Sequence, residues 1–178
     1  INLASYCIGG TLLSMTLANL KNIEKKTESL THLKNIKIKD RINSATFFAS
    51  LVNFENFGDL QMFISEKQIN AIEQEMKRVG YFDGRNLAAT FNFLRPGDLY
   101  WNYVVNNYLL GNEPSAFDVL YWNSDSTNLP AKLYSDYLRS LCLNNNLAKN
   151  NYILNGKKLD LSKITTPMFH VATTADHI

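Results

Sequence analysis

Apolar residues follow a strand pattern, then a helix pattern, then a strand pattern at the start of the chain. Ile1, Leu3 and Ala4 form a short apolar opening. From residue 9 to about residue 22, apolar side chains recur three or four positions apart, which predicts a helix. Residues 45–52 (ATFFASLV) are almost continuously apolar, as is typical of a parallel strand buried on both faces. This order predicts parallel strands joined by a helix.

Helical periodicity replaces the strand signal between residues 55 and 150. One predicted helix ends at Gly80, a residue type that readily adopts the left-handed conformation after a last turn. A second is predicted over residues 99–110 with Asp98 as its N-cap. That helix is apolar on nearly every side, so we expect it to be buried or to lie at an interface. A third is predicted to begin near Pro130, which suits a first helical turn.

Strand signals return near the end of the chain. Residues 152–154 are apolar and lead into Asn155-Gly156, a dipeptide typical of a two-residue hairpin turn. Residues 168–172 follow a proline and are predicted to form a core strand. The chain starts without methionine and stops shortly after this strand, so we expect it to be a segment of a larger protein.

Composition narrows the functional classes. With 178 residues and 46% hydrophobic content the chain can bury a core, while a formal charge of +2 gives no argument for a nucleic-acid partner. The lysine-rich stretch 24–41 also contains acidic residues and is predicted to be a solvated face of unassigned role. No apolar run reaches the roughly 18 residues of a transmembrane segment. Cys7 and Cys142 form neither a disulfide framework nor a metal-ligand pattern, which favours a reducing cytoplasm, with Cys142 as a core residue.

The stretch around Cys7 predicts a nucleophile elbow with cysteine in the central place. Such an elbow is a strained strand-to-helix turn, and small residues two positions to either side, here Ser5 and Gly9, allow close packing. The sulfur would lie at a helix N-terminus, which favours negative charge. The backbone N–H of Ile8 would supply half of an oxyanion hole. The same pattern also fits a small buried cysteine.

Asp176 lies in a polar turn after the strand predicted at residues 168–172, at the sheet edge where α/β proteins place functional groups. Nucleophile followed by acid is the chain order of α/β-hydrolases. None of the three histidines fits the missing base: His32 lies in the lysine-rich stretch, His170 within the strand and His177 beside Asp176. We therefore expect the catalytic histidine to follow Ile178.

Together these features predict an α/β fold: a partial α/β-hydrolase core with a parallel sheet, interrupted by a largely helical cap or lid. The predicted segments are residues 1–54 for the part of the core with the elbow, 55–150 for the cap, and 151–178 for the part with the acid loop.

The sequence resembles the polyhydroxyalkanoate synthases, also called poly(3-hydroxyalkanoate) polymerases, and within them the single-subunit type. The resemblance covers nearly the whole chain, and its aromatic stretches are more specific than the elbow. One departure is Ser5, where the family usually has glycine. The matching stretches are 7–12 (CIGGTL), 93–99 (FLRPGDL), 101–111 (WNYVVNNYLLG), 117–123 (FDVLYWN), 127–130 (TNLP) and 176–178 (DHI).

The resemblance implies Cys7 as catalytic nucleophile and Asp176 as catalytic aspartate. It implies polymerisation of (R)-3-hydroxyacyl-CoA into polyhydroxyalkanoate with release of CoA, through a covalent cysteine thioester, the thioester being substrate and no cofactor being needed. The implied partners are the growing polyester chain, a second copy of the protein bound through the cap, and the surface of a polyester granule. Arg95 would contact either the coenzyme A phosphates or an acidic residue within the cap.

Two alternatives remain open from the residues. A cysteine-dependent thioesterase of the same fold would release free hydroxyacid, whereas a non-catalytic association module would use the aromatic helices only for binding. Monomer length, dimer geometry and lid state stay open as well.

Overall fold

The computed structural model describes residues 1–28, 39–114 and 118–174. The chain divides into two compact units, one made of Ile1–Gly58 with Arg139–Ile178 and the other of Asp59–Leu138. We call them the sheet unit and the inserted unit. Within the described ranges, no helix is both long and apolar enough to cross a membrane.

Three parallel strands form the centre of the sheet unit, in the order β1 (Asn2–Tyr6), β2 (Ser44–Phe48) and β7 (Met168–Val171). The register pairs Tyr6 with Phe48 and Phe48 with Val171, so all three strands end at the same edge. The prediction of parallel strands in a mixed α/β chain is confirmed.

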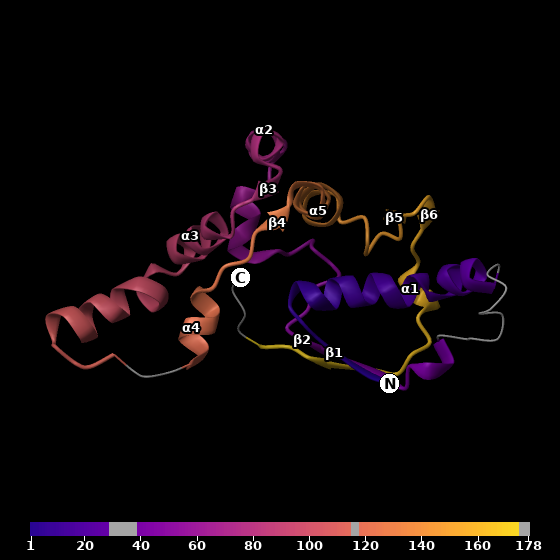
Figure 1. Cartoon of the computed structure of the whole chain (residues 1–178), viewed down its shortest axis with the longest axis horizontal. Helices are drawn as coiled ribbons and strands as arrows, with labels where there is room; N and C mark the ends of the chain where they lie inside the picture. Colours follow the sequence, from indigo (N-terminus) through magenta and orange to yellow (C-terminus); the bar gives the residue numbers. More distant parts are fainter. Residues whose placement is uncertain (29–38, 115–117, 175–178) are drawn as a thin grey trace. The chain divides into compact units, whose positions relative to one another are not determined.

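Helix α1 (Ile8–Glu28) connects β1 to β2 and packs along the sheet (Figure 1). Its apolar residues Leu17 and Leu20 meet Ala45 and Phe47 of β2 in a buried cluster. The partly buried side chains packed against this cluster are Leu3, Leu13, Ile42 and Ile164. Alternate residues of β2 therefore face α1, as expected from the period of a strand.

Two features of this sheet differ from the sequence prediction. The apolar run 45–52 is a strand only as far as Phe48, because Ala49 adopts φ +45° and turns the chain. Residues 168–171 do form a strand, but their predicted place in the core is wrong, since all four are exposed. The reason is that β7 is an edge strand of the sheet, whereas the buried cluster lies between α1 and β2.

The returning part of the sheet unit is held by short elements. A π-helical segment, η5 (Tyr137–Leu143), leads into it, and Cys142 is buried as predicted. Strands β5 (Ile153–Leu154) and β6 (Lys157–Lys158) pair antiparallel. Asn155 and Gly156 between them have φ +52° and +76°, which confirms the predicted hairpin turn. The 3-10 helices of this unit are η1 (Lys39–Arg41) and η6 (Leu161–Lys163).

The inserted unit has its buried side chains around α2 (Glu66–Val79) and α5 (Ala131–Asp136), which pack together. Ser65 caps the N-terminus of α2, and Gly80, at φ +86°, ends it as predicted. Helix α5 begins near Pro130, as predicted, but Pro130 is its N-cap and not part of the first turn. Short strands β3 (Tyr81–Phe82) and β4 (Leu129–Pro130) pair antiparallel beside them, and the 3-10 helix η2 (Gly58–Phe63) precedes α2.

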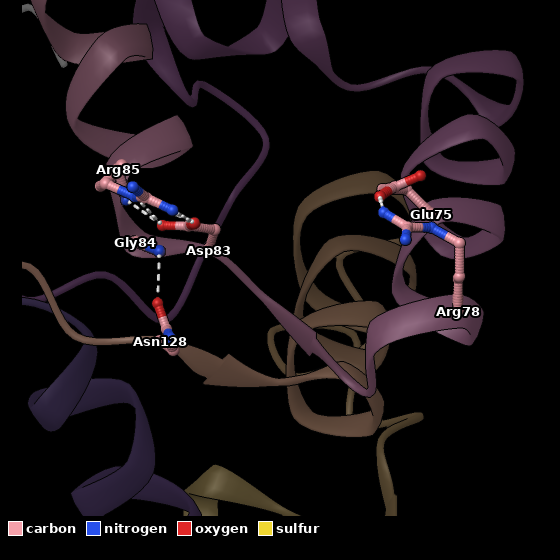
Figure 2. Close-up of polar contacts among 6 residues, drawn as sticks. All are labelled: Glu75, Arg78, Asp83, Gly84, Arg85 and Asn128. Carbon is pink, nitrogen blue, oxygen red and sulfur yellow. Dashed lines mark hydrogen bonds and ion pairs between the residues drawn. The ribbon is translucent and has the colours of Figure 1, made fainter.

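Figure 2 shows how the start of α3 (Gly84–Leu94) is joined to the residues before β4. The side-chain oxygen of Asn128 accepts a hydrogen bond from the backbone N–H of Gly84 at 3.0 Å. Asp83 caps α3 by accepting from the backbone N–H of Arg85 at 2.9 Å. This hydrogen bond joins the two ends of residues 84–128, a stretch of the inserted unit here called the excursion.

Within that excursion the predicted helix over residues 99–110 takes a wide form. It comprises the π-helical segments η3 (Gly97–Trp101) and η4 (Val104–Leu109), followed after Gly111 by α4 (Asp118–Ser124). Asp98 is not the N-cap, because the helix already includes Gly97 and Pro96 precedes it. Of the two predicted alternatives, burial within the chain does not hold, because much of this helix is exposed, and the interface alternative stays a prediction. The stretch 93–122 carries exposed aromatic side chains and is here called the aromatic segment. These side chains are Phe93, Tyr100, Trp101, Tyr103, Tyr108, Tyr121 and Trp122.

Candidate functional site

Cys7 lies between the last residue of β1 and the first residue of α1. Its φ of +50° falls in the left-handed region, which a non-glycine residue adopts at a cost. The Cys7 N–H donates to the carbonyl of Phe48 at 3.0 Å, and its own carbonyl accepts from Gly10 N–H at 2.9 Å. The side chain is exposed. This is the strained strand-to-helix turn that the sequence predicts.

The small residue that packs closely at this turn is Gly10, and the prediction of Gly9 is wrong. A methyl group added to Gly9 would meet no atom within 4 Å. On Gly10 the same group would overlap the side chain of Ser50 and lie 3.1 Å from a ring carbon of Phe47. On the strand side, Ser5 is half-buried and its hydroxyl donates to the Thr46 carbonyl at 3.2 Å.

The turn after β2 lies directly against this elbow. Ala49 donates its N–H to the Val171 carbonyl at 2.9 Å, which joins the turn to β7. Ser50 donates its hydroxyl to the Phe48 carbonyl at 3.1 Å. Thr11, which is 1% exposed, donates its hydroxyl to the Leu51 carbonyl at 2.6 Å. Sequence reasoning did not find these residues, because only the contact between distant segments makes them significant.

The other predicted site residues have different outcomes. Ile8 opens α1, so its backbone N–H belongs to the first turn, where a helix cannot satisfy its own donors. Asp176, His177 and His32 lie outside the described residues. His170 stacks on Phe47 with ring centroids 4.7 Å apart and an interplanar angle of 8°, which accounts for it as a packing residue.

Hydrogen bonds lower the pKa of two carboxyl groups among the described residues. A hydrogen bond from Arg85 lowers the pKa of Asp83, and a hydrogen bond from Ser162 lowers the pKa of Asp160. Arg95 forms an ion pair with Asp98 at 3.3 Å, so the acidic partner within the insert is present. Among the described residues, no three His, Cys, Asp or Glu side chains gather in a way that could hold a metal ion.

Comparison with known proteins shows that the chain is similar along its whole length to several poly(3-hydroxyalkanoate) polymerases. The chain is 47% identical over 175 residues to a poly(3-hydroxyalkanoate) polymerase of Methylorubrum extorquens, covering 98% of this chain and 27% of the relative. It is 42% identical over 178 residues to the poly(3-hydroxyalkanoate) polymerase subunit PhaC of Rhizobium meliloti, and 36% identical over 184 residues to that of Cupriavidus necator. These cover 100% of this chain and 27% and 29% of the relatives. No protein-family model matches the chain.

Proposed function

We propose that the chain carries the nucleophile of a poly(3-hydroxyalkanoate) polymerase on a partial α/β-hydrolase core. It is related along its whole length to the poly(3-hydroxyalkanoate) polymerases. The chain spans about a quarter of the length of these relatives. The observation that carries the proposal is the exposed Cys7 at φ +50°, between a parallel strand and a helix N-terminus. A cysteine that served only to fill the core would be buried, and nothing in that role would require a strained backbone.

The proposed reaction is acyl transfer in two steps. The Cys7 thiolate attacks the carbonyl carbon of an (R)-3-hydroxyacyl-CoA, the bond to the coenzyme A sulfur breaks, and CoA leaves as a thiolate that takes up a proton. The acyl group is now a thioester on Cys7. The 3-hydroxyl of another acyl unit then attacks this thioester and gives up its proton to a base. An ester forms, and the Cys7 thiolate is released. Because a thioester replaces a thioester, the acyl group stays activated between the steps.

Three further groups take part in the proposed mechanism. The backbone N–H of Ile8, in the first turn of α1, stabilises the oxyanion of each tetrahedral intermediate. Asp176 orients the histidine base or helps to activate the incoming hydroxyl. The histidine is proposed to lie outside residues 1–178, as the resemblance implies. No cofactor is required, since the coenzyme A thioester is the substrate.

The inserted unit is proposed to be the cap of this enzyme. Transfer to a hydroxyl group in preference to water requires a shielded site, and a largely helical insert can provide the shield. The exposed side chains of the aromatic segment suit contact with a second copy of the protein or with a polyester granule in the cytoplasm. Its exposed fractions include 56% for Trp101 and 83% for Tyr108.

Release of CoA from an (R)-3-hydroxyacyl-CoA by the full-length protein tests this proposal. We expect Cys7→Ala to abolish CoA release. Cys142→Ala, the matched variant of the buried cysteine, should retain it. Equal activity of wild type and Cys7→Ala would contradict the proposal. The product then separates the reaction classes, because insoluble polyester supports the polymerase, whereas free hydroxyacid would indicate a thioesterase. No CoA release at all would favour an association module.

A further inference from the structure

The elbow of Cys7 makes three contacts with the end of β2 and the turn at residues 49–51 that follows it. Cys7 N–H donates to the Phe48 carbonyl at 3.0 Å, just before the turn. The side chain of Ser50 lies against the backbone of Gly10 and occupies the space that a Cβ atom on residue 10 would need. Thr11 then donates its hydroxyl to the Leu51 carbonyl at 2.6 Å. Both sides of the elbow, the residue at its tip and the first turn of α1, are therefore held by one short segment.

The turn itself is tightly constrained. Ala49 adopts φ +45°, which an alanine does not favour, while its N–H bonds to Val171 at the end of β7. The Ser50 hydroxyl donates at 3.1 Å to the same Phe48 carbonyl that accepts from Cys7. A backbone held in a costly conformation by several contacts is typical of a segment whose position matters for a neighbouring site.

We propose that the turn at residues 49–51 is a template for the elbow, and that Thr11 and Ser50 are positioning residues for Cys7 and for the backbone N–H of Ile8. The two side chains do not touch the reacting atoms. They fix the first turn of α1 against the end of β2, and so set where the thiol and the oxyanion donor lie relative to one another. The catalytic part of this inference rests on the function proposed above, whereas the positional part does not.

Gly10→Ala and Gly9→Ala form the first test pair. Only the methyl group at position 10 meets the Ser50 side chain, so only Gly10→Ala should displace the elbow. We expect single-turnover acylation of Cys7 by (R)-3-hydroxybutyryl-CoA to slow by about tenfold or more in Gly10→Ala, as displacement of a reacting group does. Gly9→Ala should stay within about twofold of wild type on the same scale.

Thr11→Val and Thr16→Val form the second pair, which decides the matter if Gly10→Ala does not fold. Both substitutions remove a hydroxyl from α1, but Thr16 is exposed and donates to Leu12 of its own helix at 2.9 Å. We expect Thr11→Val to slow acylation with little change in KM, and Thr11→Ser to restore the rate. Thr16→Val should behave as wild type.

Alkylation of Cys7 by iodoacetamide, followed by peptide mass spectrometry at a temperature where each variant is folded, needs no substrate recognition. We expect Gly10→Ala and Thr11→Val to slow it about two- to fivefold, because the sulfur moves relative to the helix N-terminus. If wild type is acylated but the two variants of each pair do not differ from one another in either assay, the template proposal is wrong and the proposed function stands. If the variants of a pair differ in alkylation but wild type is not acylated, the template proposal stands and the proposed function is wrong.

Discussion

In the sheet unit, long side chains from distant segments are completely enclosed, whereas the inserted unit keeps most of its aromatic residues in contact with solvent. Phe47, Leu147 and Leu159 of the sheet unit are at most 1% exposed. In the inserted unit, Ile69 reaches 0%, but Tyr108 is 83% exposed. Every residue of the inserted unit between positions 85 and 130 whose burial is described is at least partly exposed.

The difference shows where each unit obtains its stability and what is left for function. The sheet unit has an internal core, so it can hold a strained residue such as Cys7 in place. The aromatic segment gains little from its own chain, and exposed apolar surface of this kind is typical of an interaction site. Its proposed role in association therefore fits its poor burial, and substitutions should affect the two units very differently.

The largest expected contrast is between Phe47→Ala and Tyr108→Ala. Phe47 is 1% exposed and packs among the α1 and β2 side chains, so its loss should lower the free energy of unfolding by about 3–5 kcal/mol. Tyr108→Ala should change it by no more than about 0.5 kcal/mol. Urea denaturation of both variants measures this, and equal effects would show that the burial contrast between the units is wrong.

Asn145 provides the next contrast, within the sheet unit. It is 7% exposed, accepts from the Phe54 N–H at 3.0 Å and donates to the side-chain oxygen of Asn53 at 2.6 Å. Asn145→Ala should therefore lower the free energy of unfolding by about 2–3 kcal/mol more than Asn155→Ala. The control is matched in backbone, because both asparagines have φ +52°.

The Asn53 oxygen also accepts from Glu55 N–H, so Asn53 acts as an acceptor towards both partners. Asn53→Asp should consequently be tolerated, whereas Asn145→Asp, which removes the donor, should not. The opposite order in a thermal melt would mean that this bond does not have the direction described.

A smaller effect is expected at the contact that closes the excursion of the inserted unit (Figure 2). A methyl group on Gly84 would lie 2.7 Å from the carbonyl oxygen of Thr127, so Gly84→Ala should destabilise by about 1–2 kcal/mol. Gly97→Ala meets no atom within 4 Å and should stabilise its helix by about 0.5–1 kcal/mol. Thermal unfolding of both variants gives the sign, and destabilisation by both would contradict the expected difference in space.

The smallest expected effect is a pH dependence of α3. The hydrogen bonds from Arg85 hold the pKa of Asp83 below its ordinary value of about 4. A lowered folded-state pKa contributes stability above the unfolded-state value, and this is lost as the pH falls through the folded-state pKa. The protection factors of the amides at the start of α3, which are corrected for the intrinsic exchange rate, should therefore fall below about pH 4. Asp83→Asn should flatten that response, and an unchanged profile would count against the cap.

Much of the fold was predictable where a local pattern determines the structure. The apolar opening, the small residues around Cys7 and the helical spacing after it predict the strand-to-helix turn, and Asn155-Gly156 predicts the hairpin. Gly80 and Pro130 likewise predict helix ends that the structure has. In each case neighbouring residues alone decide the conformation.

The remaining features depend on contacts between distant segments. Alanine gives no signal for a positive φ, so Ala49 ended β2 unexpectedly, and the choice of Gly10 over Gly9 follows only from the position of Ser50. An apolar helix has the same pattern whether its own chain or another molecule covers it, which is why the sequence left burial and an interface open for residues 99–110, and only the structure shows the exposure. The role of Asp176 stays a prediction from chain order and resemblance.

Peptide mass spectrometry of the full-length protein, quenched after mixing with (R)-3-hydroxybutyryl-CoA, tests the role of Cys7 most directly. We expect one or more hydroxyacyl units on the peptide that contains Cys7, removable by hydroxylamine and absent from Cys7→Ala. Release of CoA with the acyl group on Cys142, on another residue or on no residue would contradict the proposed nucleophile.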